Sequence, residues 1–101
     1  MVGNLIYMAP EIMRWMQVTK KCDIYSFGII LWEVMSRKNP FNDMLHFHEI
    51  VEGLRPNVND VVDIQNSDDI KILITKCWDA NPQNRPSMKG VVAIMEKYSF
   101  Y

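Results

Sequence analysis

Hydrophobic positions along this chain recur with the spacing of helices and not with that of strands. Apolar residues separated by three and four positions indicate one face of an α-helix, whereas a half-buried strand alternates with a period of two. No alternating stretch extends beyond a few residues, and the chain contains no internal repeat and no low-complexity segment. The pattern therefore predicts an all-α fold.

The longest predicted helix runs from about Lys21 to Arg37 and is apolar around nearly its whole circumference. Its apolar positions are Ile24, Tyr25, Phe27, Ile29, Ile30, Leu31, Trp32 and Val34. Such a helix is typically buried at the centre of a fold. Gly28 lies in its middle, where glycine costs about 1 kcal/mol relative to alanine. We expect another backbone to pass close to Gly28.

Two short helices are predicted on either side of this central one in the sequence. The first runs from Pro10 to about Met16, since proline is tolerated at the first position of a helix. The second runs from about Leu45 to Glu52, with Gly53 as its C-terminal cap. Residues 39–43 are predicted as a turn and residues 55–66 as a loop.

The fourth predicted helix begins near Ser67 or Asp68, either of which can cap it, and Asn81-Pro82 stops it. Its apolar stripe consists of Ile70, Leu73, Ile74, Cys77 and Trp78. The fifth helix follows Ser87, a suitable capping residue. One face of it carries Met88, Val91, Val92, Met95 and Tyr98. We therefore expect about five helices around the helix that holds Gly28.

Composition supports a folded domain and excludes several functions. Hydrophobic residues make up 49% of the 101 residues and charged residues 23%, which is sufficient for a globular core. The net charge of -1 gives no indication of nucleic-acid binding. No apolar run approaches the ~20 residues of a membrane span. Cys22 and Cys77 are expected to remain thiols, as in a cytoplasmic protein.

No active site emerges from residue types and spacing alone. His46, His48 and the two cysteines lack the spacing of a metal site. The four glycines are isolated, so no phosphate-binding loop is present. No serine, cysteine or lysine belongs to a nucleophile motif. We predict no catalytic residue, metal or cofactor site within the chain.

Four motifs, taken together, resemble a protein kinase from the end of its activation segment to the end of its catalytic domain. In chain order they are Tyr7-Met8-Ala9-Pro10-Glu11, Asp23-Ile24-Tyr25-Ser26-Phe27-Gly28, Asn39-Pro40-Phe41, and Cys77-Trp78-Asp79 through Asn81-Pro82 to Arg85-Pro86-Ser87. The first resembles the A-P-E segment of kinases. The resemblance covers residues 1–101 as one partial domain and implies the helical C-terminal lobe of the kinase fold.

Within that family the chain resembles the tyrosine-kinase-like branch of Ser/Thr kinases. The segments Gly28–Val34 and Thr75–Trp78 look closest to the TGF-β-activated MAP kinase kinase kinase, with the mixed-lineage and Raf kinases as near alternatives. Tyrosine kinases typically carry a proline and a Lys-Trp pair before Met-Ala-Pro-Glu. Gly3 and Tyr7 stand in this region instead, which favours the Ser/Thr branch.

The resemblance implies structural roles for three charged residues. Glu11 and Arg85 look like the buried ion pair that joins the A-P-E segment to the loop before the last helix. The alternative is two exposed charges worth less than about 1 kcal/mol. Asp23 resembles the residue that accepts hydrogen bonds from the catalytic loop, although a carboxylate in the first turn of a helix is also favourable by itself.

The resemblance also implies two surfaces for protein substrates. The substrate-binding platform comprises Gly3, Asn4, Leu5, Ile6, Tyr7 and Met8. Asn4 departs from the family pattern, in which threonine or serine helps to hold the catalytic residues. The helix carrying Phe47, Ile50 and Val51 resembles a docking helix, and its alternative role is simple packing on the lobe.

The parts of a kinase that handle nucleotide are not among these 101 residues. The sequence has no Gly-rich loop and no His-Arg-Asp or Asp-Phe-Gly string. We expect an inactive fragment, lacking the N-terminal lobe and catalytic loop, of a kinase that uses ATP and Mg²⁺. Resemblance implies MAP kinase kinases as substrates, an activating adaptor as partner and a stress or immune MAP kinase cascade. A pseudokinase-like scaffold and a stand-alone helical interaction module are the alternatives.

Overall fold

The computed structural model describes residues 7–13, 19–40, 47–61 and 67–98. Every regular element in these ranges is helical. The α-helices are α2 (Pro10–Met13), α3 (Lys21–Ser36), α4 (Phe47–Val51), α5 (Ser67–Cys77) and α6 (Met88–Tyr98), and the short 3₁₀ helices are η1 (Val58–Asp60) and η2 (Pro82–Asn84). The prediction of an all-α fold with about five helices is confirmed.

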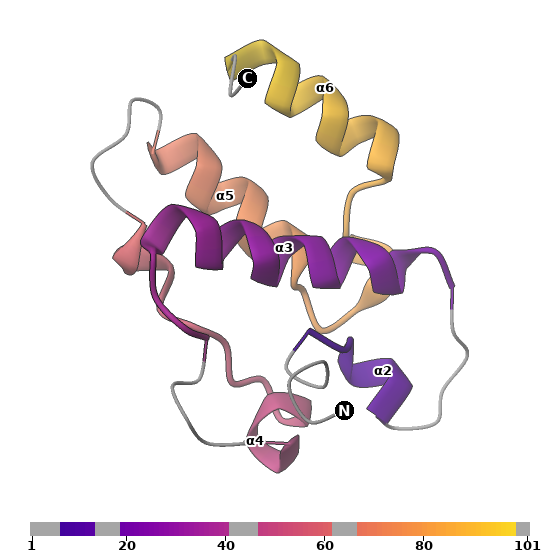
Figure 1. Cartoon of the computed structure of the whole chain (residues 1–101). Coiled ribbons are helices and arrows are strands. Elements are labelled where there is room, and N and C mark those ends of the chain that lie inside the picture. Colours follow the sequence, from indigo (N-terminus) through magenta and orange to yellow (C-terminus); the bar gives the residue numbers. More distant parts are fainter. Residues whose placement is uncertain (1–6, 14–18, 41–46, 62–66, 99–101) are drawn as a thin grey trace.

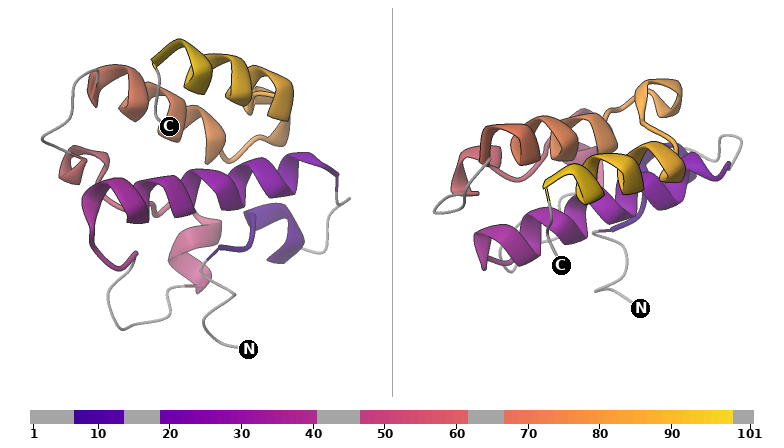
Figure 2. Two further views of the ribbon diagram at one scale, coloured as in Figure 1. Left: turned by 45° about the horizontal axis from the view of Figure 1, so that its top comes forward. Right: turned by 90° about the horizontal axis from the view of Figure 1, so that it is seen from above.

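Helix α3 crosses the middle of the molecule. Helices α5 and α6 lie on one side of it, and α2 and α4 lie on the other (Figures 1 and 2). The core is formed where α3 packs against α5. The buried stripe of α5 comprises Ile70, Leu73, Ile74 and Cys77, and Trp78 directly after the helix is also buried, as the spacing predicts.

The contact between α3 and α5 requires glycine at position 28. A Cβ atom on Gly28 would lie 2.8 Å from the Cβ of Cys77 and 3.4 Å from the carbonyl oxygen of Ile74. The expected close approach of another backbone at Gly28 is therefore confirmed, and that backbone belongs to α5. Both cysteines are free thiols and buried.

Several helix ends lie where the sequence predicts them. The hydroxyl oxygen of Ser87 accepts a hydrogen bond from the Gly90 amide at 3.1 Å, which caps α6. Gly53, the second residue after α4, has a φ of 121°, as expected of a C-terminal cap. Helix α3 ends one residue earlier than predicted because Arg37 takes the left-handed conformation, with a φ of 59°.

Other helix boundaries differ from the predicted ones or cannot be compared with them. Helix α2 is described as far as Met13, and the predicted continuation to Met16 lies outside the described residues. The same holds for Leu45 before α4. Helix α5 already includes Ser67 and Asp68, so neither of the predicted capping residues lies before the helix. The predicted loop after Arg55 contains η1, because the Asn57 side chain accepts a hydrogen bond from the Asn59 amide at 3.0 Å.

Two apolar faces are more exposed than their patterns predict. On α3, Ile30 is 46% exposed and Val34 is 64% exposed, so the helix is not buried all round. On α6, Val91 is buried, whereas Met88 and Val92 are exposed. No described element covers these side chains. The hydrophobic pattern was therefore correct for helix formation and wrong for complete burial.

Among the described helices, none has the length and apolar character needed to cross a lipid bilayer.

Candidate functional site: a buried ion pair between the first and last motifs

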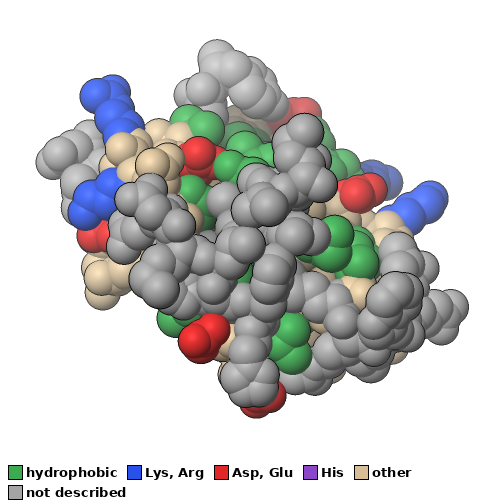
Figure 3. Space-filling view, turned by 60° about the horizontal axis from the view of Figure 1, so that its bottom comes forward, with side chains coloured by type: hydrophobic (Ala, Val, Ile, Leu, Met, Phe, Trp, Pro, Cys, Tyr) green, Lys and Arg blue, Asp and Glu red, His purple; other side chains and the backbone are tan. Residues whose placement is uncertain are grey.

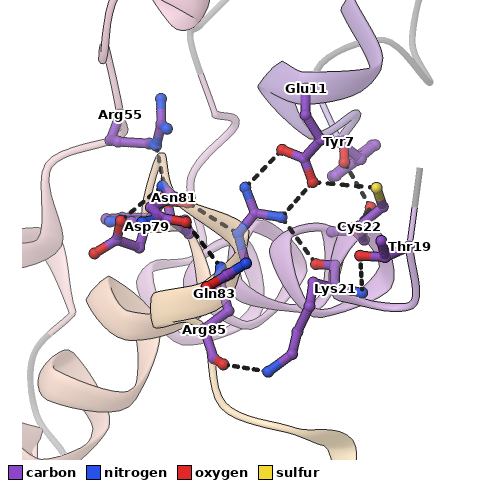
Figure 4. Close-up of polar contacts among 12 residues, drawn as sticks. Tyr7, Glu11, Thr19, Lys21, Cys22, Arg55, Asp79, Asn81, Gln83 and Arg85 are labelled. Carbon is purple, nitrogen blue, oxygen red and sulfur yellow. Dashed lines mark hydrogen bonds and ion pairs between the residues drawn. The ribbon is translucent and has the colours of Figure 1, made fainter. Parts of the chain in front are cut away.

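Glu11 and Arg85 form a buried, bidentate ion pair between the first turn of α2 and the residue after η2. One guanidinium nitrogen of Arg85 lies 2.6 Å from Oε2 of Glu11 and the other lies 2.8 Å from Oε1 (Figure 4). Glu11 is 4% exposed and Arg85 is 2% exposed. Parallel hydrogen bonds of this kind are stronger and more directional than those of a single contact. The structure thus places together the two residues that the sequence analysis paired.

Backbone carbonyl groups complete the surroundings of Arg85. Its Nε donates to the carbonyl oxygen of Asp79 at 2.9 Å, and its Nη1 donates to that of Lys21 at 2.9 Å. A second hydrogen bond joins the same two residues, in which Nζ of Lys21 donates to the carbonyl oxygen of Arg85 at 2.5 Å (Figure 4). Arg85 therefore joins α2, the start of α3 and the loop after α5. Satisfying these donors is what makes a buried guanidinium tolerable.

A thiol also contacts the pair. Sγ of Cys22 donates to Oε2 of Glu11 at 3.1 Å. Burial by itself would raise the pKa of the Glu11 carboxyl. The hydrogen bonds from Arg85 and Cys22 outweigh it and hold the pKa of Glu11 below its usual value. Burial raises the pKa of the Cys22 thiol, which therefore stays protonated at neutral pH.

Tyr25 lies beside the ion pair and under two guanidinium groups. The guanidinium carbon of Arg85 is 5.1 Å from the centre of the Tyr25 ring, and that of Arg55 is 5.0 Å from it. Both distances are within the range of a cation–π interaction. Arg55 is fixed by its Nε, which donates to the carbonyl oxygen of Trp78 at 2.9 Å. Tyr25 is fully buried, and its hydroxyl has no hydrogen-bond partner among the described residues.

The start of the A-P-E motif is tied separately to α3. The hydroxyl of Tyr7 donates to Oε1 of Glu33 at 2.7 Å, and the hydroxyl of Ser26 donates to the carbonyl oxygen of Tyr7 at 2.6 Å. The hydrogen bond to Glu33 is the main reason why the pKa of Tyr7 is raised to about 12. Tyr7 is therefore neutral over the physiological range and acts as a hydrogen-bond donor.

The described residues provide structure and not reaction chemistry. No group of three or more His, Cys, Asp or Glu side chains among them could hold a metal ion. Burial raises the pKa of Cys77 to about 12, so this thiol is a poor nucleophile. What the site can do is hold the A-P-E segment rigidly against α3 and the loop before α6.

Comparison with known proteins identifies the family to which this chain belongs. A sequence profile of the family described as protein tyrosine and serine/threonine kinase matches residues 2–95. The chain belongs to the protein kinase family. The matched range includes both partners of the ion pair, so the kinase motifs at the two ends of this range meet in space through Glu11 and Arg85.

Individual kinases are similar to almost the whole chain. The dual specificity protein kinase shkC of Dictyostelium discoideum is 37% identical over 100 residues, which cover 93% of this chain and 19% of that kinase. The mitogen-activated protein kinase kinase kinase 7 of Homo sapiens is 37% identical over 99 residues, covering 92% of this chain and 16% of that kinase. Its Drosophila melanogaster counterpart is also 37% identical, over 94% of this chain and 14% of that kinase. This chain therefore spans less than a fifth of the length of these relatives.

The other residues to which the sequence analysis gave a role are Asp23, the substrate-binding platform and the docking helix, and they differ in how exposed they are. Asp23 lies in the first turn of α3 with an exposed carboxylate. Tyr7 and Met8 of the platform are half-buried, and Gly3, Asn4, Leu5 and Ile6 lie outside the described residues. On the proposed docking helix, Ile50 is 1% exposed and Val51 is half-buried, while Phe47 begins the helix. The packing of Ile50 leaves Val51 as the more accessible of the two.

Sequence reasoning missed several contacts of the kinase site. It did not pair Tyr7 with Glu33, Cys22 with Glu11, or Arg55 with Tyr25. No periodicity relates these residues, because each pair joins different elements. Polar residues within apolar stretches, such as Glu33 after Trp32, are the signal by which their involvement could have been found.

Proposed function

We propose that this chain is the C-terminal part of the catalytic domain of a Ser/Thr protein kinase of the MAP kinase kinase kinase type. The parent protein would transfer the γ-phosphate of ATP to serine and threonine hydroxyls of proteins, in a stress or immune MAP kinase cascade. The observation that carries this proposal is the buried Glu11–Arg85 pair within a family match over residues 2–95. The relatives named as mitogen-activated protein kinase kinase kinase 7 support the narrower assignment.

In this proposal the described residues support the substrate side of the reaction. Tyr7 and Met8 belong to the platform that receives the substrate polypeptide, and the contacts of Tyr7 with Glu33 and Ser26 fix the platform to α3. Asp23 presents its exposed carboxylate to the catalytic loop of the parent. ATP and Mg²⁺ would bind to parts of the parent that carry the Gly-rich loop and the metal-binding aspartate. The chain by itself would not transfer phosphate.

The proposed partners follow from the same assignment. Protein substrates would be MAP kinase kinases, an adaptor subunit would activate the parent, and the protein would act in the cytoplasm. Asn4 favours a second candidate function, because it departs from the family pattern at a position near the catalytic loop. That candidate is a scaffold with weak or no catalysis, or a helical interaction module.

A phosphorylation assay on the parent protein separates these functions. The full-length gene product is incubated with labelled Mg-ATP and a catalytically inactive MAP kinase kinase, and the labelled amino acids are identified. We expect phosphoserine and phosphothreonine from the parent and none from residues 1–101 alone. An Asn4→Thr variant tests the departure at this position. A folded parent that binds the substrate without labelling it would establish the scaffold function instead.

A further inference from the structure

We propose that Arg55 is a positioning residue for the A-P-E segment, on which it acts through the ring of Tyr25 that it shares with Arg85. Arg55 follows α4 and, among the described residues, forms no hydrogen bond with Glu11 or any other part of α2. Its influence on the A-P-E segment would therefore be indirect. The coupling lies within this chain, and only its consequence for substrate binding rests on the proposed function.

Arg55 holds the end of α4 against the end of α5. Its Nη1 donates to the carbonyl oxygens of Ile50 at 3.0 Å and Leu54 at 2.8 Å. Its Nε donates to the carbonyl oxygen of Trp78, the residue directly after α5, at 2.9 Å. These three hydrogen bonds fix the direction of the side chain, since the guanidinium donors have a rigid planar arrangement.

Consecutive carbonyl groups bring the two arginines to the same place. Nε of Arg55 donates to the carbonyl oxygen of Trp78, and Nε of Arg85 donates to that of Asp79, each at 2.9 Å. Figure 4 shows both arginines beside the segment that carries Asp79. The two guanidinium groups are therefore held by neighbouring peptide units at the end of α5.

The ring of Tyr25 is the contact that the two arginines share. The guanidinium carbon of Arg55 lies 5.0 Å from the ring centre and that of Arg85 lies 5.1 Å from it. The hydroxyl of Tyr25 is buried and has no hydrogen-bond partner among the described residues. No described hydrogen bond thus fixes the ring, and its position depends on what packs against it. Removing the guanidinium group of Arg55 would let the ring shift away from Arg85.

Charge couples the same two groups. Burial is the main reason why the pKa of Arg55 is lowered, and the nearby charge of Arg85 lowers it further. On the face that carries α2 and α4, the visible lysine and arginine side chains lie toward the left and right edges (Figure 3). Arg85, in contrast, is 2% exposed and Arg55 is half-buried. Charges interact more strongly in such surroundings than in water.

Arg85 carries the effect to the A-P-E segment, because both of its terminal nitrogens bind the carboxylate of Glu11. The amide of Ile12, the next residue, donates to the carbonyl oxygen of Ala9 at 3.0 Å. Its rate of hydrogen exchange reports how firmly this segment is held. Under the proposed function, a loosened segment would weaken the binding of the substrate polypeptide, since the platform directly precedes it.

Hydrogen exchange of the ¹⁵N-labelled 101-residue chain, followed by NMR, tests this role of Arg55. Arg55→Met keeps an apolar stem and removes the guanidinium group. The amide of Val91, which donates to the carbonyl oxygen of Ser87 at 2.9 Å in α6, is the reference. A uniform loss of stability would raise both rates equally. We expect the ratio of the Ile12 rate to the Val91 rate to rise roughly five- to thirtyfold.

The reciprocal variant gives a second measurement, because coupling between two sites acts equally in both directions. The amide of Leu54 donates to the carbonyl oxygen of Glu49 at 2.7 Å, at the end of α4. Glu11→Gln should raise the exchange rate of Leu54 relative to that of Val91. A Leu54 rate that changes only in step with Val91 would contradict the coupling.

Two further variants separate the path through Tyr25 from a direct contact between α2 and α4, where Pro10 and Val51 line the same cavity. Val51→Ala alters that contact and should leave the Ile12 ratio unchanged. In Tyr25→Leu, which lacks the ring, Arg55→Met should have no effect on the ratio.

The coupling through Tyr25 would be overturned by an unchanged ratio in Arg55→Met, by an equal rise in Val51→Ala, or by an undiminished effect of Arg55→Met in Tyr25→Leu. If Tyr25→Leu does not fold, Val51→Ala and Glu11→Gln decide. Because the readout is exchange within this chain, each of these results is independent of whether the parent protein transfers phosphate.

Discussion

The Glu11 carboxyl group shows how single residues determine the behaviour of the site. Its pKa in the folded chain is held below the usual value by Arg85 and Cys22. In the unfolded chain a glutamate titrates near ~4.3. Between these two values the unfolded state binds more protons, so stability rises with pH there.

The pH dependence of the unfolding free energy tests whether the pKa of Glu11 is lowered in the folded chain. The contribution of Glu11 should be fully present above about pH 5 and should be lost as the pH falls through the lowered pKa of the folded state. Replacing Glu11 by glutamine should flatten the acid limb of the unfolding free energy measured in urea at a series of pH values. An acid limb of the same slope in both proteins would contradict the shift.

Tyr25 gives a second prediction at the residue scale. Its ring contacts two guanidinium groups, whereas its buried hydroxyl has no partner among the described residues. Tyr25→Phe keeps the ring and removes a desolvated polar group, so stability should stay the same or rise by up to about 1 kcal/mol. Tyr25→Ala should cost about 3–5 kcal/mol by leaving a cavity. Thermal unfolding of both variants measures the difference, and a large loss in Tyr25→Phe would show that the hydroxyl is bonded.

The packing of α3 on α5 is the main contact between elements. Gly28→Ala would improve helix propensity by about 1 kcal/mol. The added methyl group would, however, lie 2.8 Å from the Cβ of Cys77. We expect a net destabilisation of about 1–3 kcal/mol, because the two helices must separate.

Gly90→Ala in α6 is the matched control for this prediction. The nearest atom to its added Cβ would be Oγ of Ser87 at 3.4 Å, so this change should be neutral or stabilising. Urea unfolding of the two variants gives the comparison. If Gly28→Ala were the more stable of the two, the close approach of α3 and α5 would be contradicted.

Elements were predictable where local chemistry determines them. The stripe from Ile70 to Trp78 fixes which side of α5 is buried, and Ser87 fixes the start of α6. Periodicity did not reveal what covers each face. Ile30 and Val34 are as apolar as their buried neighbours, yet no described element packs over them. Burial depends on contacts between distant segments, which a local pattern does not contain.

The candidate site was predictable only to the extent that the kinase resemblance supplied it. Glu11 and Arg85 were paired by their motifs, since two charges 74 positions apart have no local relation. The link from Tyr7 to Glu33 joins the A-P-E segment to the middle of α3 and was not found. Polar contacts between elements follow from the fold, and the fold must be known before they can be assigned.

At the scale of the whole molecule, the Glu11–Arg85 pair connects two segments that lie far apart in the sequence. It joins the segment before α3 to the loop before α6, across most of the sequence. Breaking a buried ion pair by removing one partner typically costs about 3–5 kcal/mol. The ion pair between Lys38 and Asp60, with side chains 59% and 28% exposed, is the matched comparison. Exposed pairs contribute less than about 1 kcal/mol.

A double-mutant cycle on Glu11 and Arg85 tests most directly whether one buried pair joins the two ends of this kinase lobe. Glu11→Gln, Arg85→Gln and the double variant are unfolded in urea beside the corresponding Lys38 and Asp60 variants. We predict a coupling free energy above about 1.5 kcal/mol for the buried pair and below about 1 kcal/mol for the exposed one. Equal, near-zero coupling for both pairs would contradict the account.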